Sequence, residues 1–334
     1  MNKNQILRIS LIVCAVLLVG AVIMSLTGVW GGIGYRYASA EQYTAGGTTV
    51  EGAVRNLDVD WIDGKVTIAY HSEPTVLISE TATKDIPDDL KLRWWLDGDT
   101  LRVRYARSGA FHLSWNLKKE LTLTLPEGAA LGDVRLEATS GELIIPALRA
   151  DSLKLQVTSG EITAAASADT VDSKMTSGDM TLTLSGTVRQ VLTSATSGNI
   201  RIEADTAEKV QASVTSGRIQ VTAAKVGDCK TTATSGTLAV EITDAGTVEL
   251  KGTSANATIR LGRLDRLDAG VTSGNISAFL PTEPGFRAHV SVTNGRFDTG
   301  LALQKEGNDY LCGDGSASVT LRSTSGNIRL DPLP

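Results

Sequence analysis

One tripeptide, Thr-Ser-Gly, returns along the chain at an almost constant interval. Successive copies are 18 to 21 residues apart, most often 19, until a final step that carries an insertion. Two copies are degenerate: Ala255 replaces the glycine in one, and Asn294 replaces the serine in the other. A fixed period of this length is typical of a solenoid, in which each repeat forms one structural unit. The turn glycines of the repeat are Gly141, Gly160, Gly178, Gly198, Gly217, Gly236, Gly274, Gly295 and Gly326.

The residues around each glycine form columns that keep their polarity from repeat to repeat. Positions seven and three before the glycine, and two after it, are mostly apolar, as Val134, Ala138 and Leu143 are around Gly141. The position directly after the glycine is polar, as Glu142, Glu161 and Asp179 are. This alternation predicts two β-strands per repeat, each with one face inward. We therefore expect an all-β fold, a parallel β-helix or β-solenoid of about ten 19-residue coils, stacked about 4.8 Å apart.

The tripeptide itself is expected to form the turn between the two strands. Glycine adopts a positive φ without steric cost, and stacked Thr and Ser hydroxyls can hydrogen-bond to the turn backbone. An array that binds ice or a saccharide through its threonines is the alternative. A structural ladder is favoured, because the threonines form one column and not a flat grid of two.

An uncharged stretch of 22 residues, Ile9 to Trp30, follows Lys3 and Arg8. That length can cross a bilayer as a helix, and positive charges before it favour an N-terminus inside the cell. We expect a single-pass cell-membrane protein with a cytoplasmic N-terminus and an extracytoplasmic C-terminal domain. A cleaved signal peptide is the alternative, since Ala38-Ser39-Ala40 resembles a cleavage site.

The expected domains follow from these two features. Four of the five tryptophans lie between residues 46 and 128, a segment that also alternates as β-strands. Such a segment is suited to cap the open end of a solenoid, which would otherwise expose unpaired strand edges. The expected organisation is a cytoplasmic stub (1–8), a transmembrane anchor (9–30), a linker (31–45), an N-terminal β cap (46–128) and the solenoid (129–334).

One surface of the expected cap stands out as a candidate binding patch. Asp97-Gly98 marks a hairpin, and alternation places Arg93, Trp95, Arg102 and Arg104 on one face of it. Cations beside an exposed aromatic ring can bind an anionic polymer or lipid headgroups. The alternative is a solvated face, with Trp95 packed under a neighbouring strand.

Composition argues against several other classes of site. The chain has 37 acidic and 32 basic residues and no basic stripe, so no nucleic-acid partner is expected. Its three histidines are scattered, so neither a metal site nor a cofactor is expected. Glu142, Glu161 and Asp179 form a stacked acidic ladder that could bind a cation weakly. No catalytic residues are expected, because the outward columns change identity from coil to coil.

The chain resembles a bacterial family of β-strand-repeat proteins named as candidate adhesins, whose function is largely unknown. The resemblance rests on a strand from Lys119 to Pro126, on the Ser-Gly-x-Ile coils, and on the closing segment from Gly313 to Leu330. It covers roughly residues 50–330 and implies the fold, but no catalytic residues.

We therefore expect a non-enzymatic, membrane-anchored cell-surface β-solenoid. Its role would be that of an adhesin or an envelope- or wall-associated binding scaffold. The partner would be the membrane itself and an anionic cell-wall polymer, a lipid or an envelope protein. The alternative is an envelope-stress sensing or regulatory protein, and a polysaccharide-active enzyme is the less favoured third.

Overall fold

The computed structural model describes residues 35–110 and 117–334, which form β-structure with one 3-10 turn, η1 (Ala40–Gln42). The expected stub (1–8) and anchor (9–30) lie outside the described residues. Within those residues, no helix has the length and apolar character to cross a membrane. In chain order the strands are β1 (Thr44–Ala45), β2 (Thr48–Val50), β3 (Asn56–His71), β4 (Val76–Ala82), β5 (Arg93–Asp97), β6 (Thr100–Arg104), β7 (Lys119–Pro126), β8 (Ala130–Ile145), β9 (Arg149–Ser273), β10 (Ile276–Leu280), β11 (Gly285–Asn294), β12 (Phe297–Thr299), β13 (Gln304–Glu306), β14 (Asp309–Gly313), β15 (Ala317–Ser325) and β16 (Ile328–Pro332).

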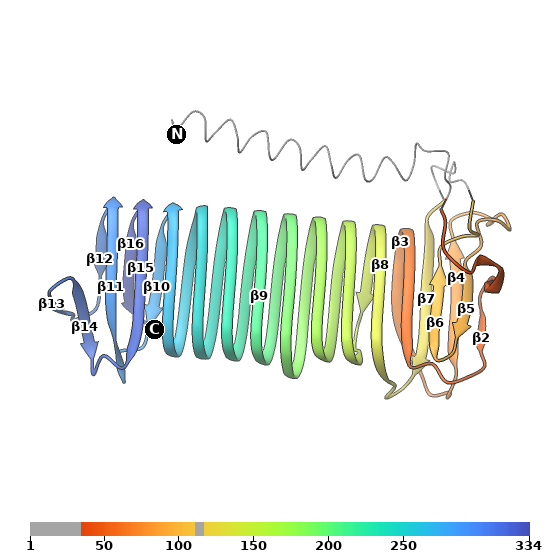
Figure 1. The fold of residues 1–334 in the computed structure, drawn as a ribbon, viewed down its shortest axis with the longest axis horizontal. Coiled ribbons are helices and arrows are strands. Elements are labelled where there is room, and N and C mark those ends of the chain that lie inside the picture. The colour runs from red at the N-terminus through yellow and green to blue at the C-terminus, as the bar shows by residue number, and fades with distance from the viewer. Residues whose placement is uncertain (1–34, 111–116) are drawn as a thin grey trace, which may run out of the picture.

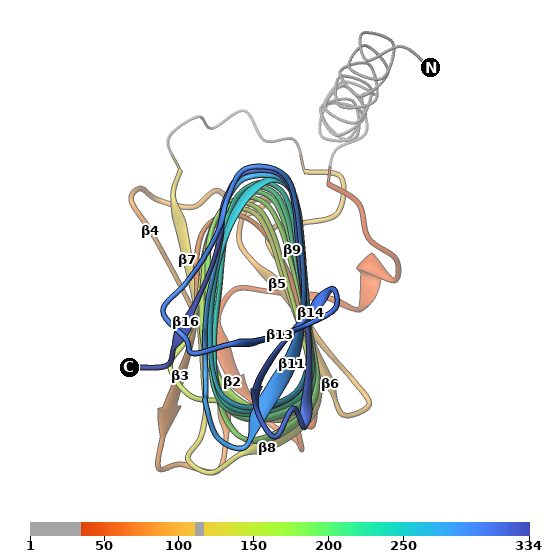
Figure 2. The same ribbon diagram turned by 90° about the vertical axis from the view of Figure 1, so that its left-hand side faces the viewer.

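The strands wind into a rod of stacked coils (Figure 1). β8 pairs in parallel with the start of β9, and Gly141 lies beside Gly160. β9 runs for 125 residues without interruption, because the pairing continues from coil to coil. Viewed along the axis, the coils overlay as a narrow loop with two long flat sides (Figure 2). The fold is therefore all-β and of the β-solenoid type.

The turn between the two flat sides has no room for a side chain. The nine turn glycines have φ values between +129° and +155°, a conformation that strains any residue with a Cβ. A Cβ on Gly217 would also lie 1.8 Å from the carbonyl oxygen of Gly198 in the preceding coil. Both the conformation of the turn and the approach of the neighbouring backbone therefore require glycine at this position.

The apolar columns fill the space between the flat sides. Val134 and Leu143 are 1% and 0% exposed, and the equivalent residues of later coils are also buried, apart from the half-buried Phe297. Burying one such side chain stabilises the fold by about 1.5–3 kcal/mol relative to leaving it in water. The stack of these columns forms one continuous core along the rod.

The stack begins one turn before the first Thr-Ser-Gly copy. β3 pairs in parallel with β8, and Gly64 stands beside Gly141 with a φ of +101°. Leu57, Trp61 and Val66 occupy the apolar positions seven before, three before and two after this glycine. β3 is thus a solenoid coil inside the segment assigned to the cap, separated from the other coils by the excursion of β4 to β7.

That excursion closes the N-terminal end of the rod. β6 and β7 pair in parallel with the two halves of β3 and form an outer coil. β5 and then β1 extend one side by antiparallel pairing, while β4 and then β2 extend the other. The outermost strands have only two and three residues, which limits the unpaired edge.

The coil that comes last in the sequence is not last in the stack. β15 lies between β9 and β11, and β16 lies between β10 and β12, with parallel pairing on both sides (Figure 1). Gly326 therefore stacks on Gly274, and Gly295 stacks on Gly326. β14 covers the outer edge of β11 in antiparallel orientation, and β13 pairs with β14. The order of the repeats in space thus differs here from their order in the sequence.

Candidate binding surfaces

The four residues of the candidate patch lie together on the β5–β6 hairpin. β5 and β6 pair in antiparallel orientation, with Arg93 opposite Arg104 and Trp95 opposite Arg102. Cross-strand partners point to the same side of a sheet, so the four side chains share one face. The opposite face carries Leu92, Leu101 and Val103, each 0% exposed.

The three arginines of this face are engaged by acidic or carbonyl oxygens. Both Arg102 and Arg104 place a guanidinium nitrogen 2.7 Å from the same oxygen of Asp58. Arg102 also lies 3.0 Å from Asp97. Arg93 donates to the carbonyl oxygen of Asp88 at 2.8 Å, with the carboxylate 3.7 Å away. Their charges are thus largely balanced within the cap.

Asp58 is the centre of this cluster. Burial alone would raise the pKa of its carboxyl group, but the hydrogen bond and charge of Arg104, with the charges of Arg135 and Arg102, hold that pKa below its usual value. The neighbouring Asp60 has a raised pKa, because its burial outweighs the attraction of Arg104. Asp58 is therefore held in its ionised form, and its carboxylate binds two guanidinium groups.

A segment expected to be a linker covers part of this cluster. Residues 35–45, here termed the N-terminal strap, pack on the cap through tyrosines. The Tyr35 hydroxyl donates to the carbonyl oxygen of Asp60 at 3.1 Å, and that of Tyr37 donates to Ala106 at 3.1 Å. Tyr43 contacts Trp95 edge to face, with ring centroids 5.7 Å apart, and lies 5.8 Å from the Arg104 guanidinium carbon. Residues 35–45 therefore pack on the cap, whereas residues 31–34 of the expected linker lie outside the described residues.

The candidate patch is consequently less accessible to a ligand than the alternation of residues along the hairpin implied. Arg93 and Arg104 are each 8% exposed, and the Arg102 side chain is 33% exposed. Trp95 is half-buried. Binding of an anionic polymer or lipid here remains a prediction, but two of its three cations hold the cap together and do not face solvent.

A buried lysine in the cap was missed by the sequence analysis. Lys119 is 0% exposed, and its ammonium group lies 2.5 Å from Glu80 and donates to the carbonyl oxygens of Leu90 and Tyr105. Its charge also lies 4.0 Å from the Tyr105 ring centroid. Burial lowers the pKa of Lys119, and Glu80 partly opposes that shift. The signal was present, because Lys119 is in phase with the inward leucines of β7.

The turn edge of the rod carries the threonine column. These threonines are exposed, apart from the half-buried Thr158. At the C-terminal end the residue after the turn forms an amide ladder: the backbone N–H of Asn275 donates to Asn256 Oδ1 at 2.9 Å, and that of Asn327 donates to Asn275 Oδ1 at 2.8 Å. The column consists of Thr139, Thr158, Thr176, Thr196, Thr215, Thr234, Thr253, Thr272, Thr293 and Thr324.

The three carboxylates of the acidic ladder, Glu142, Glu161 and Asp179, each contact a different residue. Glu142 forms an ion pair with Lys65 at 3.4 Å, and Glu161 accepts a hydrogen bond from Thr163 at 3.0 Å. Asp179 accepts two hydrogen bonds from Asn199. These contacts account for the three carboxylates locally. Across residues 35–110 and 117–334, no three His, Cys, Asp or Glu side chains are grouped so as to hold a metal ion.

Comparison with known proteins places the chain in a family. A search of curated proteins finds no relative. A crystal structure titled "a putative cell adhesion protein from Clostridium sporogenes" shares 14% identity over 87% of this chain and 99% of that one, with a TM-score of 0.21, which is too low to establish a common fold. A family model described as Toastrack DUF4097 matches residues 54–267, from the strand that opens the solenoid through most of its coils. Because this match spans more than half of the sequence, the chain belongs to the Toastrack DUF4097 family.

Proposed function

We propose that this protein is a non-enzymatic scaffold of the cell surface, an adhesin-like rod that binds an envelope or wall component. The observation that carries the proposal is the contrast between the inward and the outward positions of each coil. The buried columns are mostly apolar along the stack, whereas the outward column four residues before the turn glycine changes from Thr232 to Lys251, Gly270 and Arg322. The buried polar exceptions in the inward columns are Ser173, Thr193, Thr231 and Ser323. A constant core with a varied flat surface suits a scaffold that presents binding surfaces, and the family match is compatible with it.

Anchoring in the cell membrane is the second part of the proposal. Residues 9–30 have the length and composition of a transmembrane helix. The N-terminal strap, which follows them, is bound to the cap through Tyr35 and Tyr37. An anchor at 9–30 would therefore hold the rod by its capped end, with only a few residues between membrane and cap.

The same strap favours envelope sensing as a second candidate function. The strap contacts Arg104 and Trp95, so a ligand that disturbs this cluster would also disturb the connection to the anchor. Under this alternative, Tyr35→Phe with Tyr37→Phe would alter an envelope-stress reporter without altering the amount of envelope material bound.

Two measurements on the full chain test the proposal. Protease added to wall-stripped cells should digest the chain beyond about residue 35, because a helix at 9–30 spans the bilayer, while a tag before Lys3 stays protected. Purified protein should co-sediment with isolated cell-wall material and release no soluble sugar from it. Protection of the repeats in intact cells would contradict the surface location, and release of sugar would contradict the non-enzymatic role.

A further inference from the structure

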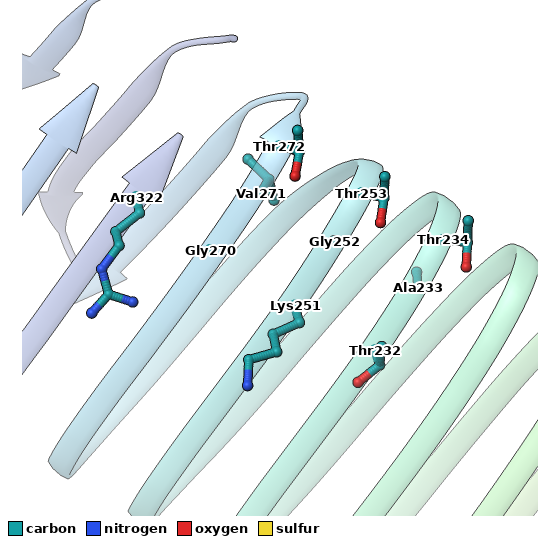
Figure 3. A pocket seen from close by; sticks show the side chains of 10 residues that line it. All are labelled: Thr232, Ala233, Thr234, Lys251, Gly252, Thr253, Gly270, Val271, Thr272 and Arg322. Atoms are coloured by element: carbon teal, nitrogen blue, oxygen red, sulfur yellow. The ribbon is translucent and has the colours of Figure 1, made fainter. Parts of the chain in front are cut away.

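A shallow pocket lies near the C-terminal end of the rod, on the flat side formed by the strands before the turn (Figure 3). Its volume is about 370 Å³. Lys251 and Arg322 stand on either side of Gly270, and Thr253 and Thr272 lie along the adjacent turn edge. Here we term the space between Lys251 and Arg322 the notch.

The intercalated last coil builds this notch. Arg322 of β15 pairs in register with Gly270 of β9, and Lys251 holds the same column one coil earlier. Two coil spacings separate the cations, which corresponds to about 10 Å between their backbones. Stacking in sequence order would instead have placed Ser291 beside Gly270. The two cations therefore meet only because β15 inserts between β9 and β11.

Gly270 leaves the space between the cations unfilled. A Cβ built on it would meet no atom within 4 Å, in contrast to the turn glycines. Its φ is not in the positive range, so the position does not require glycine for conformational reasons. Gly270 is thus a gap in a column whose neighbours carry long side chains, and the gap exposes backbone as the floor of the notch.

Both cations are exposed, and each pairs with a partly buried carboxylate. Arg322 lies 3.0 Å from one oxygen of Asp268, and Lys251 pairs with Glu249, which also binds Lys230 at 3.1 Å. The Lys251 and Arg322 side chains are 61% and 56% exposed. Ion pairs in which the cation is this exposed contribute little stability. The guanidinium of Arg322 offers five N–H donors, so it can bind a second oxyanion beside Asp268.

We propose that the notch binds an oxyanion, phosphate or carboxylate, carried on a hydroxylated sugar or polyol polymer. Arg322 would bind two oxygens of the anion and Lys251 would add a point charge, which is the usual division between these residues. The hydroxyls of Thr253 and Thr272 lie where they can bond adjoining sugar or polyol hydroxyls. This site deepens the proposed function by naming its ligand class, and it depends on that function only for the source of the polymer.

Binding of soluble polymers to the full chain in detergent tests the notch directly. The two probes are a poly(glycerol phosphate) and a polyuronate, which distinguish phosphate from carboxylate as the source of the charge, with neutral dextran as the control. We expect one or both anionic probes to bind, more weakly as salt rises, because screening reduces charge–charge attraction. Failure of both anionic probes at low salt would overturn the proposal.

Three variants examine the notch by different means. Arg322→Gln and Lys251→Gln each remove one cation and should weaken binding about five- to tenfold. Gly270→Gln keeps every charge but fills the gap, and should weaken binding to a similar degree without unfolding the protein, because a Cβ there has room. Unchanged affinity for Gly270→Gln and Arg322→Gln would overturn the proposal.

A matched control variant distinguishes binding at the notch from attraction to positive charge elsewhere on the surface. Lys174 occupies the same column far from the notch, with a 50% exposed side chain paired to Asp172 at 3.5 Å. Lys174→Gln should bind as the unmodified protein does, and an equal loss there would overturn the proposal in favour of diffuse attraction. Co-sedimentation with cell walls that survives in Gly270→Gln and Arg322→Gln would refute the notch while leaving the scaffold function intact.

Discussion

Ala255 occupies a turn position that carries glycine in the other coils, and a second substitution in the same coil accommodates it. Ala255 is 1% exposed, and Gly252 stands where the other coils carry a side chain, most often alanine or valine. A Cβ on Gly252 would lie 2.9 Å from the Ala255 Cβ. The Ala255 methyl group therefore lies inside the coil, in space that a side chain at residue 252 would otherwise fill.

This compensation predicts non-additive effects at Gly217. Gly217→Ala should destabilise the fold by more than the roughly 1–3 kcal/mol of backbone strain alone, because its Cβ would meet the Gly198 carbonyl oxygen. Adding Val214→Gly recreates the arrangement of Gly252 and Ala255, and should recover part of that loss. Chemical unfolding of both single variants and the double variant measures the coupling between the two positions, expected at about 0.5–3 kcal/mol.

Gly270, where an added side chain has room, provides the control for these single and double variants. Gly270→Ala should change the free energy of unfolding by less than about 0.5 kcal/mol, since a Cβ there meets no atom within 4 Å. If the double variant Gly217→Ala with Val214→Gly is less stable than Gly217→Ala alone, the absence of a side chain at residue 252 is not what allows alanine at position 255.

Asp58 of β3 binds two arginines of the β5–β6 hairpin, and the N-terminal strap packs against the same arginine cluster. Because Arg104 and its neighbours lower the pKa of Asp58, the ionised carboxylate stabilises the fold above the usual value of 3.8, and this contribution is lost as the pH falls below it. Asp58→Asn should therefore reduce the free energy of unfolding at pH 7 by about 1.5–3 kcal/mol. The difference from the unmodified protein should shrink at pH 3.

Urea unfolding at the two pH values measures this effect. Asp151→Asn, at an exposed position, serves as the control and should behave as the unmodified protein does at both. A difference for Asp58→Asn that stays constant from pH 7 to pH 3 would show that its charge does not hold the cap together.

Alternation along the hairpin correctly grouped Arg93, Trp95, Arg102 and Arg104, because side-chain direction in a strand follows from position alone. It could not show that Tyr35 and Tyr43 cover that face, since nothing in a local pattern identifies what packs on it from a distant segment. The same limit concealed Asp58 as the partner of Arg102 and Arg104. Lys119 was within reach of the pattern, because it stands in an inward position of β7.

At both ends of the rod, the coil that is terminal in the sequence is placed one layer inward. β3 lies between β8 and the outer coil of β6 and β7, and β15 lies between β9 and β11. Each of these coils is therefore paired on two sides, so fraying from either end must break two sets of strand contacts. Short or antiparallel strands then cover the outermost edges, which limits association between rods.

The repeat pattern predicted the coils but not their order. The columns are nearly the same in each coil, so the coil of Gly326 could stack equally well on that of Gly295 or between it and that of Gly274. The insertion before Gly326 was the signal of a departure, and it now accounts for the β13–β14 hairpin and the return of the chain. The position of Arg322 beside Gly270, and with it the notch, follows from this order.

Cross-linking of paired cysteines tests that order directly. Thr320 is the in-register partner of Asp268, whereas His289 pairs with Thr320 on its other side. The thiols of Cys229 and Cys312 are buried, and burial raises the pKa of Cys229 to about 12, so neither should compete for a thiol reagent. The third cysteine, Cys14, is replaced by serine in every variant. A short bifunctional reagent should join Asp268→Cys to Thr320→Cys, but should not join Asp268→Cys to His289→Cys, which lie about 10 Å apart across the intervening coil. Efficient cross-linking of the second pair and not the first would show that the coils stack in sequence order, and would contradict both the intercalated coil and the notch it builds.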